Sequence, residues 1–290
     1  MLVSVVIPAY KASDNIELTL DSIKNQTYSN IEVVIVDDFS DDYFDLKEKV
    51  SSYDGLTIKL IRQEANKKAS AARNRGAREA SGEILAFLDA DDIWYPTKIE
   101  KQLSMLKANT LISSRINVAY SDDIDSSFNV TSEFDSENTI AYNLFSKLEH
   151  NLIFQTSSLM MYKLDFFLVG GFDESLSRHQ DFQFVFDCEM SGLKLDIYNE
   201  VLVTYIKSKS SNISNKGWSI DGSIDFIHKY ENLLKNELKL NFFTVQLLGP
   251  SIKTRQLFYW FRIGRRLGFS YLELIFSSLK YISSRLVNEK

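Results

Sequence analysis

Cysteine, proline and histidine are scarce in this sequence. Its 290 residues include one cysteine, three prolines and three histidines. The single cysteine, Cys188, excludes a disulfide within the chain and is typical of a reducing compartment. A secretory signal is not expected either, because Pro8 and Lys11 interrupt the apolar run at the N-terminus. We therefore expect a cytoplasmic protein.

Long apolar runs are missing as well. No stretch approaches the about 18 consecutive apolar residues that a membrane-spanning helix needs, so any membrane contact is expected to be peripheral, at the inner face of the plasma membrane. Nevertheless, 44% of the residues are hydrophobic and 13% are aromatic. A chain of this length and composition can bury one sizeable core, or a core plus a small second unit.

Basic residues are unevenly distributed. Of the 33 Lys and Arg and 39 Asp and Glu side chains, eight basic and two acidic ones fall in residues 251–290, which leaves 25 and 37 for residues 1–250. The acidic balance of residues 1–250 excludes a general nucleic-acid surface there, and we expect no nucleic-acid partner. The basic C-terminal segment requires a separate explanation.

Short apolar runs alternate with helical patterns in the first hundred residues. We expect strands over residues 2–7, 31–36, 56–61 and 84–88. Helices are expected after Asp14, over residues 42–50 and 69–80, and after Thr97, where Thr97 and Glu100 have the spacing of a capping box. This alternation predicts a mostly parallel α/β sheet. Such sheets bind ligands beyond the carboxyl ends of their strands, where the turns at residues 8–10, 37–38 and 89–92 fall.

The pattern changes in the second half of the chain. Residues 121–150 are polar and weakly periodic, which favours an excursion over the surface. Further strands are expected over residues 157–162, 195–198 and 201–205, and a helix over residues 181–190. From residue 221 onward the pattern is helical. We therefore expect a main domain over residues 1–220 and a helical region over residues 221–290.

The strongest chemical signal is the acidic cluster Asp89-Ala90-Asp91-Asp92 at the end of the fourth expected strand. Carboxylates on such a turn can converge on Mn²⁺ or Mg²⁺, which prefer oxygen ligands and leave places for phosphate oxygens. A metal held there would act as a Lewis acid on a diphosphate leaving group. The same residues would also suit a solvated acidic turn that caps the next helix, so the surrounding motifs decide between the two interpretations.

Four further motifs flank the acidic cluster in a fixed order. They are VSVVIPAY at residues 3–10, VDD at 36–38, AARNRG at 71–76 and GFDE at 171–174. In order and spacing the sequence resembles family 2 glycosyltransferases of the bacterial cell-surface polysaccharide type, over roughly residues 1–210. The resemblance implies the GT-A fold, a Rossmann-like α/β fold with a mixed, mostly parallel sheet flanked by helices. Residues 221–290 would then be a C-terminal helical extension to a catalytic domain.

The resemblance implies a set of site residues. The nucleotide is expected at Pro8, Ala9, Tyr10, Asp37, Asp38, Arg73, Asp89 and Ala90, and the metal at Asp89 and Asp91. A carboxylate only accepts hydrogen bonds, which suits Asp38 to the imide N–H of uracil, and Tyr10 offers a flat apolar face to the base. An Asx turn and simple packing would explain the same two residues without a ligand. Arg75 and Arg78 share a helical face that Arg73 does not, so Arg73 alone is expected at the site and at least one of the three arginines is expected on the solvated surface.

By the same resemblance, Asp181 would be the catalytic base that takes the proton of the acceptor hydroxyl during direct, inverting displacement. A plain helix cap would equally explain an aspartate at this position. Gln180 departs from the family's usual Glu, and Phe39 and Lys11 replace its usual Gly and Asn. The family's histidine after the last strand is also missing. Further candidates near the site are Asp92, Gln180, His179, Lys207, Gly171 and Trp94.

The C-terminal helices combine aromatic and aliphatic residues with Arg262, Arg265 and Arg266. Such helices can lie on an anionic membrane, with the basic residues at the headgroups. Alternatively, the apolar stripe packs on the catalytic domain or on a second copy in a homodimer. Periodicity alone does not separate these arrangements.

Together these patterns predict an inverting, metal-dependent transferase that moves a hexose from a nucleotide-diphosphate sugar, preferably a UDP-sugar, to a glycan or lipid-linked glycan. Two alternatives remain at this point. One is a noncatalytic sugar-nucleotide or glycan-binding protein of the same fold, which the change at Gln180 keeps open. The other is a sugar nucleotidyltransferase, which is disfavoured because residues 8–12 contain no glycine for a phosphate loop.

Overall fold

The structure is a computed structural model that describes residues 1–121, 123–129, 134–148, 154–207 and 220–288. It divides into two compact units, each described by itself. The first contains residues 1–134 and 152–216, and the second contains residues 135–151 and 217–290. Residues 135–151 therefore group with the C-terminal helices, although the sequence pattern places them within the main domain.

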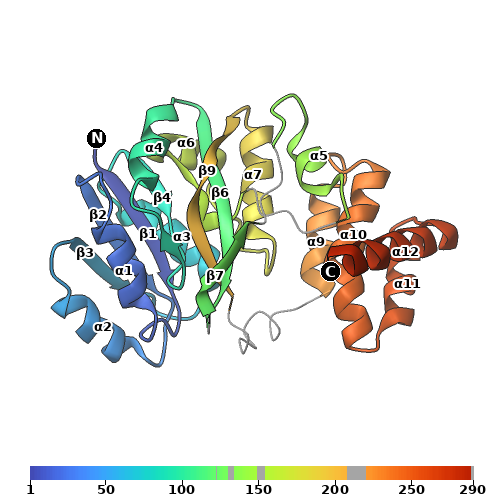
Figure 1. The fold of residues 1–290 in the computed structure, drawn as a ribbon, viewed down its shortest axis with the longest axis horizontal. Coiled ribbons are helices and arrows are strands. Elements are labelled where there is room, and N and C mark those ends of the chain that lie inside the picture. Colours follow the sequence, from blue (N-terminus) through green and yellow to red (C-terminus); the bar gives the residue numbers. More distant parts are fainter. Residues whose placement is uncertain (122, 130–133, 149–153, 208–219, 289–290) are drawn as a thin grey trace. The chain divides into compact units, whose positions relative to one another are not determined.

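The first unit is built on one mixed sheet (Figure 1). Its strands are β1 (Val3–Ala9), β2 (Ile31–Asp37), β3 (Thr57–Arg62), β4 (Ile84–Phe87), β5 (Ile93–Trp94), β6 (Thr110–Tyr120), β7 (Asp123–Asn129), β8 (Met160–Tyr162) and β9 (Lys194–Lys207). They follow the order β3-β2-β1-β4-β8-β6-β9-β5, with β7 paired to β6. The first four strands are parallel, and so are β6 and β9, whereas β8 runs antiparallel to both neighbours. The expected mixed, mostly parallel sheet is confirmed.

Helices cover both faces of this sheet. They are α1 (Ile16–Lys24), α2 (Tyr43–Ser52), α3 (Lys68–Glu79), α4 (Lys98–Met105), α6 (Lys163–Val169) and α7 (Gln180–Met190), with a 3₁₀ turn, η1 (Thr156–Ser158). One core cluster joins α1, α2 and α4 to Val3, Val5 and Ile7 of β1. The alternate residue Val6 faces α3 on the other side, because successive side chains of a strand point to opposite faces.

The structure corrects several expected elements. Strand β6 was not expected, and the two strands expected at residues 195–198 and 201–205 are one strand, β9. Between the two expected segments Asn199 and Glu200 are exposed, and pairing with β6 resumes after an irregularity at Arg115. Residues 121–150 include β7 and a short helix in place of a plain excursion. Thr97 makes no side-chain capping bond, and Glu100 accepts a hydrogen bond from Thr27.

The described part of the second unit is helical, as expected. It contains α5 (Ile140–Phe145), α9 (Ile220–Lys229), α10 (Asn236–Lys253), α11 (Leu257–Arg266) and α12 (Tyr271–Asn288). Aromatic rings fill its interior: Phe242 lies 4.9 Å from Phe145 and 5.0 Å from Phe226, measured between ring centroids. None of the helices in the described residues is long and apolar enough to cross a membrane.

Candidate active site

The ends of β1, β2, β4 and β9 open on one cleft of the first unit, with a volume of about 910 Å³. Its walls are formed by Pro8, Ala9, Tyr10, Lys11, Ala12, Asn15, Asp38, Ala69, Arg73, Asp89, Ala90, Asp91, Tyr120, Tyr205, Ile206 and Lys207. The structure thus brings together, in one cavity, every residue expected to bind nucleotide or metal except Asp37. The parallel strands explain this convergence, because their carboxyl ends meet at one edge of the sheet.

Asp38 is fixed in the cleft wall by its neighbours. Its Oδ1 accepts hydrogen bonds from the side chain of Gln63 and the backbone N–H of Lys67, and its Oδ2 accepts one from the N–H of Lys68, each at 2.7 Å. Only 3% of Asp38 is exposed. A carboxylate offers about four acceptor positions, so one on Oδ2 remains for a donor in the cleft.

Asp37 lies behind the cleft and supports the turn that carries Asp38. It is fully buried, its Oδ2 accepts a hydrogen bond from the backbone N–H of Ser40, and it pairs with Arg62 at 3.4 Å. Phe39 in this turn has a φ of 61°, a left-handed conformation that favours glycine. The guanidinium of Arg62 lies 5.0 Å from the Phe39 ring centroid. The backbone shape that glycine would favour is therefore retained by a phenylalanine.

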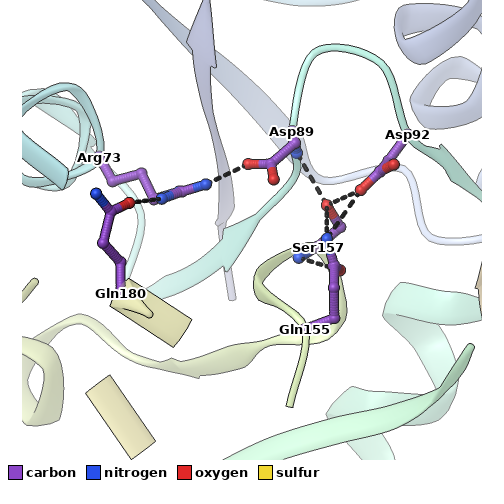
Figure 2. A network of polar contacts seen from close by, with 6 residues as sticks. All are labelled: Arg73, Asp89, Asp92, Gln155, Ser157 and Gln180. Carbon is purple, nitrogen blue, oxygen red and sulfur yellow. Dashed lines mark hydrogen bonds and ion pairs between the residues drawn. The ribbon is translucent and has the colours of Figure 1, made fainter. Parts of the chain in front are cut away.

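Arg73 connects the acidic turn to the start of α7 (Figure 2). Its Nη2 lies 2.5 Å from Oδ1 of Asp89, and its Nη1 donates a hydrogen bond to Oε1 of Gln180 at 3.3 Å. Arg73 is nearly buried on α3, with the centre of its guanidinium 5.3 Å from the Phe172 ring centroid. Arg75, by contrast, pairs with Glu79 on the exposed side of α3. Of the arginines on α3, Arg73 is thus the one that lines the cleft.

Asp91 is the exposed residue of the acidic turn, whereas Asp89 and Ala90, which also line the cleft, are half-buried and buried. The cleft walls remove much of the water around its carboxyl group, and this loss of water together with the negative charge of Asp89 raises the pKa of Asp91 to about 6. Arg73 opposes the shift. Because the protein compensates little of its negative charge, the Asp91 carboxylate is well suited to bind a cation.

Asp92 is fully buried and does not line the cleft, and Figure 2 shows its carboxyl group directed at Ser157 and Gln155. Its carboxyl group accepts hydrogen bonds from the hydroxyl of Ser157, the side chain of Gln155 and the backbone N–H of Ile206. Burial, followed by the charges of Asp91 and Asp89, raises the pKa of Asp92 well above its usual range. Ser157 also accepts a hydrogen bond from the N–H of Asp89. Asp92 therefore fixes the acidic turn to η1 and to the end of β9.

The residues of the acidic turn suit a cation whose remaining coordination positions are filled by oxygen atoms of a bound ligand. Among the described residues, no group of three or more His, Cys, Asp or Glu side chains gathers as a preformed metal centre. Mg²⁺ and similar ions are commonly held by one or two carboxylates plus substrate phosphates and water. Asp91, open to the cleft, and Asp89, paired with Arg73 but still partly exposed, match that requirement.

Asp181 is the second residue of α7 and is not among the residues that line the cleft. Its Oδ1 accepts a hydrogen bond from the backbone N–H of Phe182. Burial raises the pKa of Asp181, and the charge of Asp89 adds to the shift, whereas Arg73 lowers it. A raised pKa brings a carboxylate closer to the range in which a general base works at neutral pH. The charge of Asp181 is thus coupled to both the arginine and the acidic turn.

The remaining candidates differ in their surroundings. Lys207 lines the cleft. His179 precedes α7 with a φ of 60° and its ring stacks on Phe182. Gly171 has a φ of 74°, and an added Cβ would lie 2.7 Å from Oδ1 of Asn74, so it serves the packing of α3. Trp94 is buried, donates to the carbonyl oxygen of Ser157, and packs in the core away from the cleft lining.

Several residues of the site lack a signal in the sequence. Gln155 and Ser157 lie on a short polar turn, and only the fold brings them to Asp92 and Asp89. Tyr205 lines the cleft, and burial, with the charge of Asp92 next, raises its pKa. Tyr120 reaches the cleft from the end of β6, a strand that was not expected. Asn74 was part of a quoted motif, and its side chain joins α3 to the turn at Phe172.

Comparison with known proteins places this site in a family. The family model for glycosyl transferase family 2 matches residues 4–168. The chain is 34% identical over 233 residues to the amylovoran biosynthesis glycosyltransferase AmsB of Erwinia amylovora, covering 76% of this chain and 75% of AmsB. It is 41% identical over 110 residues to the Escherichia coli UDP-Glc:α-D-GlcNAc-diphosphoundecaprenol β-1,3-glucosyltransferase WfgD, covering 38% of this chain and 43% of WfgD.

A solved structure shows the same fold. The crystal structure of S. aureus TarS residues 1–349 in complex with UDP-GlcNAc superposes with a TM-score of 0.62 and 17% identity, covering 97% of this chain and 81% of that one. At this identity the likeness concerns the fold alone. The family match extends over most of the first unit, including nearly all of β1, β2 and the acidic turn after β4. The chain is therefore a member of glycosyltransferase family 2, an enzyme family of polysaccharide biosynthesis.

Proposed function

We propose that the protein transfers a hexose from a UDP-sugar to a hydroxyl of a growing, lipid-linked glycan in bacterial surface polysaccharide synthesis, with inversion at the anomeric carbon. The observation that carries the proposal is the convergence of Asp38, Arg73 and Asp91 on one cleft at the carboxyl ends of the strands. WfgD is named for transfer from UDP-Glc to an undecaprenol-linked acceptor, and TarS was crystallised with UDP-GlcNAc. Both names support a UDP-sugar donor here.

The nucleotide would lie along the ends of β1 and β2. The free acceptor position of Asp38 suits the imide N–H of uracil, and Tyr10, which is 44% exposed, offers its ring to the base. Pro8, Ala9 and Ala90 contribute close, mostly apolar walls. Arg73 and Lys207 bring positive charge toward the diphosphate.

Asp89 and Asp91 would hold Mn²⁺ or Mg²⁺ against the diphosphate. When bound, the ion would supply Lewis-acid stabilisation of the charge that develops on the leaving group. The protein side of the site contributes the orientation of the carboxylates: Arg73 holds Asp89, and the Asp92–Ser157 contact fixes the turn.

Asp181 would act as the base. The acceptor oxygen forms a bond to the anomeric carbon, the bond from that carbon to the diphosphate oxygen breaks, and the hydroxyl proton passes to the Asp181 carboxylate. Attack from the side opposite the leaving group inverts the anomer. Its raised pKa suits this exchange, and Arg73 restrains the shift so that a carboxylate remains available. The free, buried thiol of Cys188 agrees with a cytoplasmic location.

The proposal is tested by screening nucleotide sugars for thermal stabilisation, with and without Mn²⁺. A ligand that binds only the folded state raises Tm, by an amount that corresponds to about 2.7 kcal/mol at a hundredfold excess over Kd. We expect a shift with one or more UDP-sugars and Mn²⁺, and UDP release when acceptor is added. Stabilisation by GDP-sugars alone would contradict the uridine assignment. Binding of a UDP-sugar without transfer to any acceptor would support a noncatalytic binding protein instead.

A further inference from the structure

The last helix of the second unit is apolar on both sides. Leu274, Ser277 and Tyr281 form the buried side of α12, and Leu274 is the side chain next to Gly264 of α11. The other side, which we call the outer face of α12, carries Leu272, Ile275, Phe276, Leu279 and Ile282. Leu272, Phe276 and Leu279 are 67%, 61% and 58% exposed. Because they recur at the spacing of one helical face, they form a continuous apolar stripe.

Three arginines of α11 line a pocket that reaches the first residue of α12. This pocket of about 360 Å³ on α11 and the start of α12 is lined by Phe258, Phe261, Arg262, Arg265, Arg266 and Tyr271. Arg265 is fixed, because its Nη1 donates a hydrogen bond to the carbonyl oxygen of Phe269 at 2.8 Å and its guanidinium lies 5.0 Å from the Tyr271 ring centroid. Arg262 and Arg266 are exposed and form no ion pair with any described residue. Phe258 is 85% exposed beside them.

The charge around the pocket disfavours a second copy of the chain as its partner. Glu273 is the one acidic residue among residues 251–288, and its carboxylate already accepts a hydrogen bond from the backbone N–H of Ser270. A two-fold contact places the same patch of both copies face to face, so the arginines of one copy would meet those of the other. An anionic partner would not have this repulsion. Because the outer face of α12 is apolar, the partner must also offer an apolar layer next to its anionic groups.

We propose that the outer face of α12 and the arginine pocket form a membrane-binding surface for anionic phospholipids. The apolar stripe would enter the boundary of the acyl chains, and the arginines would bind phosphate headgroups, for which the planar guanidinium is well shaped. The inference goes beyond glycosyl transfer, since it states how the enzyme reaches an acceptor that stays in the bilayer. It rests on α11 and α12 alone.

The test is cosedimentation of the full chain with vesicles of phosphatidylcholine alone and of phosphatidylcholine mixed with phosphatidylglycerol. We expect tighter partitioning onto the anionic vesicles, weakened by salt. Arg262→Gln combined with Arg266→Gln should weaken binding to anionic vesicles roughly 30-fold, since two basic contacts at the surface are lost. Leu272→Ser combined with Leu279→Ser should weaken it more than about tenfold through the loss of buried apolar area.

Matched control variants remove two basic charges or two exposed leucines from the first unit. Lys47→Gln with Lys107→Gln removes two exposed charges, and Leu164→Ser with Leu168→Ser removes two leucines that are 70% and 66% exposed. Both should bind vesicles like the wild type. Equal loss in a control pair, or no preference of the wild type for phosphatidylglycerol, would overturn the proposal. So would a wild-type dimer that the Leu272 and Leu279 changes dissociate without altering vesicle binding. The measurement needs no donor or acceptor, so its failure would leave the proposed transfer intact.

Discussion

Asp91 differs from the two aspartates beside it in what its carboxylate contacts. Asp89 pairs with Arg73, and Asp92 is surrounded by donors in the core, whereas Asp91 faces the cleft. Loss of water and the charge of Asp89 raise its pKa to about 6. Ionisation of Asp91 therefore lowers the stability of the cation-free protein, and a bound cation would offset that loss. A residue selected for ligand binding is expected to reduce stability in this way.

We predict that Asp91→Asn stabilises the cation-free protein while abolishing Mn²⁺-dependent UDP binding. The folded pKa lies above the unfolded value of 3.8, so the wild type loses stability as pH rises from about 4 to about 6 and stays at that lower level above pH 6. Asparagine does not ionise, so the Asp91→Asn protein does not lose stability over this pH range. Because Asp91 is exposed, we expect a modest gain of about 1 kcal/mol, or roughly 2–4 °C in Tm, at neutral pH.

The control is Asp45→Asn, which changes an exposed aspartate of α2. It should alter neither Tm nor UDP binding. Calorimetric scans between pH 4 and pH 8 without metal, followed by UDP titrations with Mn²⁺, measure both effects. An Asp91→Asn protein that binds UDP with wild-type affinity in Mn²⁺ would contradict the role given to Asp91.

Asp181→Asn should leave donor binding within about twofold of wild type and lower transfer by a factor of about 10² to 10⁴, the usual contribution of a general base. The expectation follows because Asp181, at the start of α7, is not among the residues that line the cleft, although the charges of Arg73 and Asp89 influence its pKa. Asp54→Asn, at an exposed position after α2, is the matched control. Wild-type turnover in Asp181→Asn would exclude Asp181 as the base.

At the scale of elements, the close approach of α3 to β1 determines where Arg73 lies. A Cβ added at Gly76 would lie 2.4 Å from Cγ1 of Val6, so the helix can rest on the strand only because residue 76 is glycine. Three residues earlier on the same helix, Arg73 reaches Asp89 and Gln180. The packing of α3 and the geometry of the site are therefore linked.

Gly76→Ala should destabilise the fold by about 1–3 kcal/mol through overpacking, despite the better helix propensity of alanine. It should also weaken Mn²⁺-dependent UDP binding, because α3 must shift away from β1 and carry Arg73 with it. Urea unfolding and UDP titration measure the two effects. Arg78→Ala, on the exposed side of α3, serves as the control and should change neither. A fully stable Gly76→Ala protein would show that the helix can move without cost.

The elements also show how far the sequence could be interpreted. Local apolar periodicity was sufficient for β1 to β4, because each is a short buried run next to an amphipathic helix. It failed for β6, whose identity depends on pairing with β9, more than 80 residues away in the chain. It failed again at the expected capping box, where Glu100 accepts from Thr27 of a neighbouring segment. Contacts between distant segments leave little local pattern.

At the site, too, local motifs could be predicted from the sequence, whereas contacts between distant segments could not. The strand-end motifs could be located from their order along the chain, because parallel strands bring their carboxyl ends together. The different surroundings of Asp89, Asp91 and Asp92 could not be predicted, because three nearly adjacent aspartates look alike in a sequence. Ser157 and Gln155 decide that Asp92 is turned into the core, and they lie more than 60 residues further on.

At the scale of the whole molecule, the two units have separate tasks in this account. The first unit holds the cleft, with the acidic turn at its centre. The second unit presents the outer face of α12 and the arginine pocket. Because the proposed donor site is lined by residues of the first unit, the vesicle-binding variants at Leu272 and Leu279 should bind Mn²⁺ and UDP like the wild type. A loss of UDP affinity in these variants, measured by calorimetry, would contradict this division.

The most direct test of the central claim is anomalous diffraction from crystals grown with Mn²⁺ and UDP. The account predicts one manganese peak within bonding distance of the Asp91 carboxylate and of the UDP diphosphate, with the uracil at Asp38, and no such peak in Asp91→Asn crystals. Ordered UDP with no manganese beside Asp91, or manganese bound elsewhere while Asp91 turns away, would contradict it.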